Sequence, residues 1–126
     1  MTPQDKELIQ IAQKLIKKRY VKGRHHIASV IKTKSGRIYS GVHVEVYIGR
    51  ITRCGEAVAL GAAATEGDAD IETIVAVDET GRVVSPCGMC REMIADYSPD
   101  ASVILLIDDT LQKKEILDLL PYKYQK

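Results

Sequence analysis

The sequence contains neither tryptophan nor phenylalanine, and its only aromatic residues apart from histidine are six tyrosines. So few aromatic side chains argue against a protein that stacks on exposed nucleic-acid bases. No apolar run approaches the roughly 20 residues that cross a bilayer, and the first residues, MTPQDKELIQ, lack the basic start and apolar core of a signal peptide. We therefore expect a cytoplasmic protein that has no membrane partner.

Cysteine is also scarce, and the three cysteines in 126 residues are an odd number, which excludes a fully paired disulfide framework. Internal repeats, low-complexity tracts and linker-like stretches rich in Pro, Gly or Ser are absent as well. The length and a hydrophobic content of 45% suit one globular domain. We expect residues 1–126 to form that single domain.

The net charge of +1 hides an asymmetry along the chain. Residues 1–40 carry ten Lys or Arg and two acids, whereas residues 41–126 carry eight basic residues and fifteen acids. Such a split is typical of some polyanion-binding proteins. The basic residues are dispersed here, which favours a solvated helix face and a basic loop. A polynucleotide editor or RNA-binding module is therefore the weaker alternative.

The apolar pattern predicts alternating helices and strands. The first helix has Thr2 as its N-cap, Pro3 in its first position and Asp5 where a capping box needs an acid, and Gly23 ends it. Strands are predicted over 26–33, 37–47, 71–77 and 102–107, and further helices over 54–65, 88–97 and 111–120. This order predicts an α/β fold in which helices sandwich a mixed sheet.

Two short motifs carry the chemistry. Cys54-Gly55-Glu56 and Pro86-Cys87-Gly88-Met89-Cys90 each lie at the start of a predicted helix. A helix N-terminus favours thiolate, which is the form that binds zinc. Three protein ligands leave the fourth tetrahedral position to water, as in catalytic zinc sites. We therefore expect one Zn²⁺ per chain on the three cysteines, with Glu56 as the catalytic residue that moves protons.

Each motif is less specific alone than the two are together. A lone Cys-x-x-Cys also occurs in redox pairs and zinc ribbons. Both motifs in this order, with the proline, match the pattern of zinc deaminases. A purely structural zinc site closed by His25, His26 or His43 is the alternative that the sequence excludes least.

With these motifs, the sequence resembles the zinc-dependent cytidine deaminase family, in its short form with three cysteines. The likeness runs from about Ala28 to Pro121. It implies a three-layer α-β-α sandwich with a mixed five-stranded sheet, and a homotetramer. It also implies hydrolytic deamination of a cytosine-type nucleoside, cytidine or deoxycytidine, to the uracil form plus ammonia. In that reaction Glu56 protonates ring N3 and then the leaving amine.

The resemblance also implies substrate-binding residues. The family's Asn-Val-Glu motif, which holds the sugar hydroxyls, corresponds to His43-Val44-Glu45, so His43 and Glu45 are expected to hold the sugar or its equivalent. Tyr124 is expected to be the C-terminal aromatic that completes a site in the oligomer. Many three-cysteine members have an Arg after the catalytic Glu that offsets the thiolate charge, and here Ala57 takes that place. Arg91 or Arg53 is expected to do this instead.

The sequence is also similar to the blasticidin S deaminases, in Gly-Arg-Ile-Tyr-Ser-Gly-Val at 36–42 and in Ser-Pro-Cys-Gly at 85–88. Glu45 favours a sugar-bearing substrate, whereas His43 in place of Asn and Ala57 in place of Arg support a second possibility for the substrate. The alternative is a cytosine-containing antibiotic, a modified cytosine, a purine or a pterin.

Overall fold

The computed structural model describes residues 1–126, and it consists of helices and strands that alternate along most of the chain. In order, the elements are α1 (Pro3–Arg19), β1 (Ala28–Thr33), β2 (Ile38–Val42), the 3₁₀ helix η1 (Gly49–Ile51), α2 (Gly55–Thr65), β3 (Ile71–Val77), β4 (Val83–Val84), α3 (Gly88–Tyr97), β5 (Ser102–Ile107), β6 (Thr110–Glu115) and the 3₁₀ helix η2 (Ile116–Leu119). None of the helices combines the length and the apolar character that a bilayer crossing requires.

The strands form one mixed sheet in the order β2-β1-β3-β5-β6. Strands β3 and β5 are parallel, and the other neighbouring pairs are antiparallel. The two-residue strand β4 pairs with the last residues of β3, beyond the part of β3 that pairs with β5. The predicted mixed five-stranded sheet is therefore confirmed, with β4 as a short addition.

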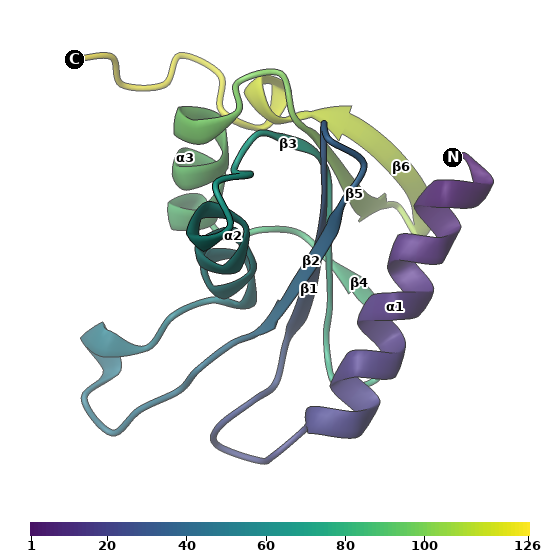
Figure 1. Ribbon diagram of the computed structural model, residues 1–126, viewed down its shortest axis with the longest axis vertical. Coiled ribbons are helices and arrows are strands. Elements are labelled where there is room, and N and C mark those ends of the chain that lie inside the picture. Colours follow the sequence, from purple (N-terminus) through teal and green to yellow (C-terminus); the bar gives the residue numbers. More distant parts are fainter.

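Helices cover both faces of this sheet, as Figure 1 shows, with α1 on one side and α2 and α3 on the other. Two apolar clusters fill the space between the layers. The first lies between α1 and the sheet and includes Leu8, Ile16, Val30, Val75 and Ile104. The second lies under α2 and α3 and includes Ile31, Leu60, Ile74, Ile94 and Val103. Neighbouring residues such as Val30 and Ile31 belong to opposite clusters because successive strand side chains point to opposite faces. The three-layer α-β-α sandwich is thus confirmed.

The start of α1 has the predicted capping box. The Asp5 N–H donates to Thr2 Oγ1 (3.1 Å), and the Thr2 N–H donates to Asp5 Oδ2 (2.9 Å). The helix ends at Arg19, four residues before the predicted end at Gly23. The helix ends early because Tyr20 leaves the helical conformation, and Gly23, with φ of +77°, belongs to the following turn.

The predicted helix over 111–120 is wrong. Residues 110–115 form β6, which pairs along its whole length with β5, and only Ile116–Leu119 make a 3₁₀ turn. Asp108 and Asp109 both adopt positive φ, at +50° and +62°. Such a two-residue turn suits the twist of an antiparallel hairpin, and it brings Thr110 opposite Ile107. The turn chemistry therefore overrides the helical spacing of the leucines.

The predicted strand over 37–47 is too long, since β2 ends at Val42. Beyond it the chain leaves the sheet in a loop that carries η1 and projects from the body of the molecule (Figure 1). Within this loop, His43 is buried at 8% exposure and Val44 is exposed at 39%. The alternation of Val42, Val44 and Val46 predicts the opposite. Val44 pairs instead with Arg53 in an isolated bridge, which sends the chain back toward α2.

Candidate active site

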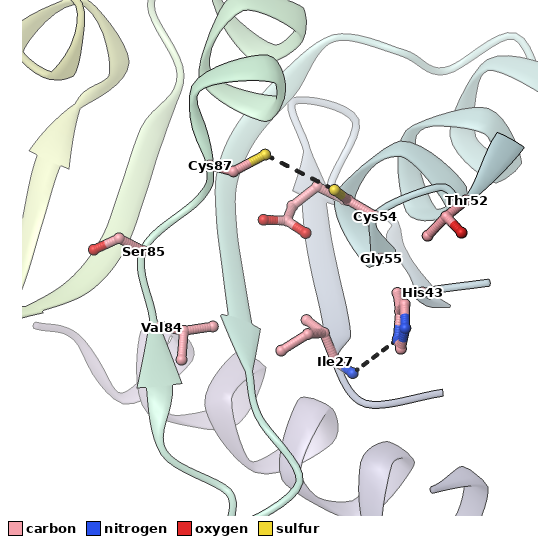
Figure 2. Close-up of a pocket in the computed structure, with 9 residues that line it drawn as sticks. Ile27, His43, Thr52, Cys54, Gly55, Val84, Ser85 and Cys87 are labelled. Carbon is pink, nitrogen blue, oxygen red and sulfur yellow. Dashed lines mark hydrogen bonds between the residues drawn. The ribbon is translucent and has the colours of Figure 1, made fainter. Parts of the chain in front are cut away.

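The three cysteines lie together at the starts of two helices. Cys54 is the N-cap residue of α2, Cys87 is the N-cap residue of α3, and Cys90 lies in the first turn of α3. Their sulfur atoms lie within 4.8 Å of one another, and Cys54 Sγ is 3.8 Å from Cys87 Sγ (Figure 2). All three are free thiols. This spacing suits three ligands of a single metal ion.

The environment treats the three thiols differently. Burial opposes ionisation of Cys87, but the backbone N–H of Cys90, the thiols of Cys90 and Cys54 and the backbone N–H of Met89 together outweigh it, so the pKa of Cys87 is lowered. These N–H groups act from the first turn of α3, although no regular capping hydrogen bond forms. Burial raises the pKa of Cys54, and the neighbouring Cys87 adds to this effect. Burial and then the charge of Glu56 raise the pKa of Cys90.

This donor set fits zinc. Three crowded sulfurs with few cationic neighbours need a positive charge among them to become thiolates together, and zinc is commonly bound by thiolates. No histidine nitrogen belongs to the group of potential ligand atoms. His25 Nδ1 faces the carbonyl oxygen of His43, and His26 Nε2 accepts from the Gly23 N–H. The predicted alternative of a site closed by a histidine has no support in this geometry.

A pocket of about 280 Å³ adjoins the cysteines. Its walls come from the start of β1, the loop after β2, the start of α2 and the segment from β4 to α3, and its lining residues are Ile27, His43, Thr52, Cys54, Gly55, Glu56, Val84, Ser85 and Cys87. Figure 2 shows Cys54 and Cys87 together at one end, with Ile27 and Val84 toward the other. The volume lies near the lower end of the roughly 300–1,000 Å³ of small-molecule sites. With apolar walls and the cysteines at one end, the pocket suits a compact substrate.

Glu56 supplies the pocket's buried carboxyl group. It lies in the first turn of α2 and is 5% exposed. Burial raises its pKa, and a hydrogen bond from its own backbone N–H opposes that rise only in part. A carboxyl group with a raised pKa is suited to accept and return a proton near neutral pH. Its place beside Cys54 puts this group next to the metal-binding cluster.

His43 and Glu45 lie side by side in the loop after β2. His43 lines the pocket directly, whereas Glu45 borders a separate hollow formed with Gly23 and Arg24. His43 Nδ1 accepts from the backbone N–H of His26 at 2.6 Å, and its Nε2 is 3.5 Å from Glu45 Oε1. The Glu45 side chain is 46% exposed. The structure thus brings both predicted substrate-binding residues to the same region.

The two predicted arginines make other contacts. Arg91 Nε donates to the Pro86 carbonyl oxygen (2.9 Å), and its Nη1 donates to that of Leu119 (3.2 Å). Arg53 Nη1 donates to backbone carbonyls in its own loop. Neither arginine has a hydrogen bond to a cysteine sulfur. Arg91 instead ties the residue before Cys87 to η2.

Tyr124 lies away from the cysteines of its own chain. It is 78% exposed and borders a separate hollow formed with Glu92, Met93 and Asp96 of α3. A single chain therefore does not bring Tyr124 to the pocket.

Several pocket residues escape prediction from the sequence. Val84 and Ser85 directly precede the Pro-Cys motif, so their position was a usable signal. No local pattern marks Ile27 or Thr52. The need for glycine at position 41 also comes from the folded structure, since a Cβ there would lie 2.6 Å from the backbone nitrogen of Ala59 in α2.

Comparisons with known proteins agree with this geometry. Residues 2–106 match the family described as the cytidine and deoxycytidylate deaminase zinc-binding region. The blasticidin-S deaminase of Bacillus cereus is 46% identical, over 100% of this chain and 96% of the relative. A cytidine deaminase of Halalkalibacterium halodurans is 31% identical, over 78% of this chain and 76% of the relative.

Solved structures share the fold. The crystal structure of cytidine deaminase from Mycobacterium tuberculosis superimposes with a TM-score of 0.83 at 22% identity, over 100% of both chains. That of Burkholderia pseudomallei gives 0.79 at 25% identity, over 98% of this chain and 100% of the other. With the family match across most of the chain and the three-cysteine cluster, these findings show that the chain belongs to the cytidine and deoxycytidylate deaminase family and is a zinc-dependent aminohydrolase.

Proposed function

We propose that this enzyme hydrolytically deaminates a cytosine-bearing antibiotic of the blasticidin S type, releasing ammonia and leaving a uracil-type ring. The observation that carries the proposal is the 46% identity, across the whole chain, to a protein named blasticidin-S deaminase. The cytidine deaminase of H. halodurans reaches 31% over a smaller part of the chain. The family's Asn-Val-Glu motif has Asn at the position of His43, and this difference also supports a substrate other than cytidine.

In this proposal Cys54, Cys87 and Cys90 hold one zinc ion per chain. When bound, zinc in such a site lowers the pKa of a water ligand to about 7 and so makes a nucleophile available near neutral pH. The N-terminus of α3 favours ionisation of Cys87, since hydrogen bonds from the Cys90 and Met89 N–H groups help to lower its pKa. Arg91 contributes by position, since it holds the carbonyl of Pro86 beside Cys87.

Glu56 is the proposed proton carrier. It lines the same pocket as Cys54 and Cys87, and burial raises its pKa. Its carboxylate takes a proton from the attacking water and delivers it to ring N3. The same carboxylate then takes the remaining proton of the hydroxyl added to the ring carbon and delivers it to the exocyclic nitrogen. The carbon–nitrogen bond breaks, ammonia leaves, and the carboxylate is free for the next turnover.

The remaining walls orient the ring. Ile27 and Val84 provide apolar surface for the flat faces of a pyrimidine, at the end of the pocket away from the cysteines (Figure 2). His43 and Glu45 are then left for the part of the substrate beyond the ring. We further propose a homotetramer in which the exposed Tyr124 reaches a neighbouring site, because its own chain leaves it away from the pocket.

Deamination of cytidine or deoxycytidine is the second candidate. Glu45 supports it, because the family's Asn-Val-Glu motif uses a Glu for the sugar, and this carboxylate lies beside His43, which lines the pocket. The two candidates share the metal, the proton carrier and the attack on the ring. They differ only in what His43 and Glu45 contact.

Ammonia release from zinc-loaded protein tests the proposal. The panel contains blasticidin S, cytidine, deoxycytidine, cytosine, 5-methylcytidine, adenosine and guanine. We expect turnover of blasticidin S that Glu56→Ala abolishes, whereas Glu66→Ala, at the exposed C-terminal end of the same helix, leaves it intact. Turnover of cytidine but not of blasticidin S would support the second candidate. Undiminished activity in Glu56→Ala would refute the assigned proton carrier.

A further inference from the structure

The hydrogen bonds around His43 fix the hydrogen on its ring. Nδ1 accepts from the backbone N–H of His26 at 2.6 Å and from that of Ile27 at 3.3 Å. A backbone N–H only donates, so Nδ1 must be the bare nitrogen and the neutral ring carries its hydrogen on Nε2. The ring is 8% exposed, and it packs against the ring of His26 with centroids 5.4 Å apart. Its orientation is therefore held by the segment that enters β1.

The other two histidines have the opposite tautomer. His25 Nδ1 lies 2.8 Å from the carbonyl oxygen of His43, which only accepts, so His25 carries its hydrogen on Nδ1. His26 Nε2 accepts from the Gly23 N–H at 2.8 Å, so His26 also carries its hydrogen on Nδ1. The chain has only these three histidines. His43 is thus the single ring with an Nε2–H.

The Nε2–H of His43 has no strong partner within the protein. Glu45 Oε1 lies 3.5 Å from it, beyond the roughly 2.7–3.2 Å of a good N–H···O hydrogen bond. His43 also lines the pocket that holds Glu56 and two of the cysteines. The Nε2–H is not sealed off from solvent, since Thr73 Oγ1 is the one buried side-chain polar atom without a partner, so the Nε2–H is free to donate to a ligand that supplies an acceptor.

We infer that His43 determines substrate specificity as a fixed, one-way hydrogen-bond donor. The main chain of His26 and Ile27 occupies Nδ1, so the ring offers only Nε2–H to the substrate, and Glu45 beside it offers only an acceptor. The site therefore selects a cytosine derivative whose group beyond the ring presents an acceptor atom to His43 and a donor to Glu45. This inference rests on the proposed function for the place of the substrate, whereas the tautomer itself does not.

The tautomer is measured directly on zinc-loaded protein labelled with ¹⁵N-histidine. Two-dimensional NMR at about pH 8.5, where imidazole is ordinarily neutral, distinguishes Nδ1–H from Nε2–H rings. We expect one Nε2–H ring and two Nδ1–H rings, and the Nε2–H pattern disappears in His43→Asn. His25→Ala and His26→Ala assign the other two. An Nδ1–H or doubly protonated His43 would overturn the inference.

Two substitutions separate the anchor from the donor. The Asn side chain is short, so His43→Asn keeps an oxygen near the position of Nδ1 but nothing at that of Nε2. His43→Gln reaches the position of Nε2 with an amide donor and loses the anchor. We measure kcat/KM for blasticidin S relative to cytidine in each. The ratio is expected to fall by about tenfold to a hundredfold in His43→Asn, as for an unpaired polar group, and by less than about threefold in His43→Gln.

Failure of the proposed function and failure of the specificity role of His43 give different results. If zinc-loaded wild-type protein deaminates no cytosine compound, the proposed function fails and the NMR result still decides the tautomer. If it deaminates blasticidin S but both variants keep the wild-type ratio, the proposed function stands and the specificity role of His43 is wrong. A loss of ratio in His43→Gln but not in His43→Asn would also contradict the inference, because the anchor would then matter and the donor would not.

Discussion

Cys54 and Cys87 are 33 residues apart in the chain, yet their sulfur atoms lie 3.8 Å apart because each is the N-cap residue of a helix on the same face of the sheet. The strands between and beneath α2 and α3 thus set the dimensions of the metal site. The close approach of α2 to β2 at Gly41 is part of that support, since no side chain fits between them.

Gly41→Ala is expected to destabilise the protein, because its Cβ would lie 2.6 Å from the Ala59 nitrogen and 2.9 Å from Val58. We expect a loss of about 1–3 kcal/mol in the free energy of unfolding, as for overpacked cores. Gly61→Ala in α2 is the matched control, since its Cβ meets nothing within 4 Å. It is expected to gain up to about 1 kcal/mol from helix propensity. Urea denaturation of both variants measures this, and equal stabilities would contradict the close approach.

Zinc content tests the ligand assignment. Wild-type protein is expected to bind one zinc per chain, and Cys90→Ser is expected to lose most of it, because the hydroxyl is a far weaker ligand than the thiolate. Met89 lies beside Cys90 but is 80% exposed, so Met89→Ser is expected to retain the metal. Elemental analysis after dialysis gives the ratio. A full complement of zinc in Cys90→Ser would contradict the assignment.

The candidate metal site was predictable from the sequence because its chemistry is local. Each motif, Cys54 with Glu56 and Cys87 with Cys90, lies within one turn of a helix start. To predict the metal site it was then enough to assume that the two helix starts lie close together. The walls of the pocket were not predictable in this way. Ile27 and Thr52 come from segments whose neighbours are determined only by the folded sheet.

The fold was predictable where apolar periodicity and burial agree, as in α1 and β3. It was not predictable at 110–120, where the leucine spacing suits a helix but Asp108 and Asp109 make a hairpin turn. Likewise, the alternating valines of 42–46 predicted a strand, but tertiary contacts bury His43 and expose Val44. In both places the decisive information lies outside the segment itself.

Asp5 makes the stability depend on pH. Burial opposes its charge, but the hydrogen bonds from Thr2 and Lys113 and the ammonium charge of Lys113 outweigh this, so its pKa is lowered. A carboxyl group with a lowered folded-state pKa stabilises the protein above its unfolded pKa of about 3.9, and that stability is lost as the pH falls through the folded value.

We therefore expect Asp5→Asn to lower the free energy of unfolding at pH 7 by about 1–3 kcal/mol. The difference from wild type is expected to shrink as the pH falls below about 4. Exposed Asp118, which forms no ion pair, provides the control as Asp118→Asn. Urea denaturation at several pH values measures both. A difference that stays constant down to pH 2 would show that the charge of Asp5 is not responsible.

Arg91 is expected to act on the metal site by position rather than by charge, because both of its hydrogen bonds go to backbone carbonyls. Arg91→Lys keeps the charge but cannot donate to both carbonyls with the guanidinium geometry. It is therefore expected to weaken zinc binding about tenfold, as is Arg91→Met. Arg82→Met, at an exposed ion pair with Asp109, serves as the control. Competition with a chromogenic chelator measures the affinities. Normal zinc affinity in Arg91→Lys alone would favour charge compensation instead.

The most direct test of the central claim is a competition reaction. Zinc-loaded enzyme receives equal concentrations of blasticidin S and cytidine, and mass spectrometry follows both deaminated products in the same tube, so that the ratio of the initial rates equals the ratio of kcat/KM. We predict that blasticidin S is consumed first and that Glu56→Gln forms neither product. Prior consumption of cytidine would contradict the proposed substrate, and the absence of both products from wild-type enzyme would contradict deamination of either compound.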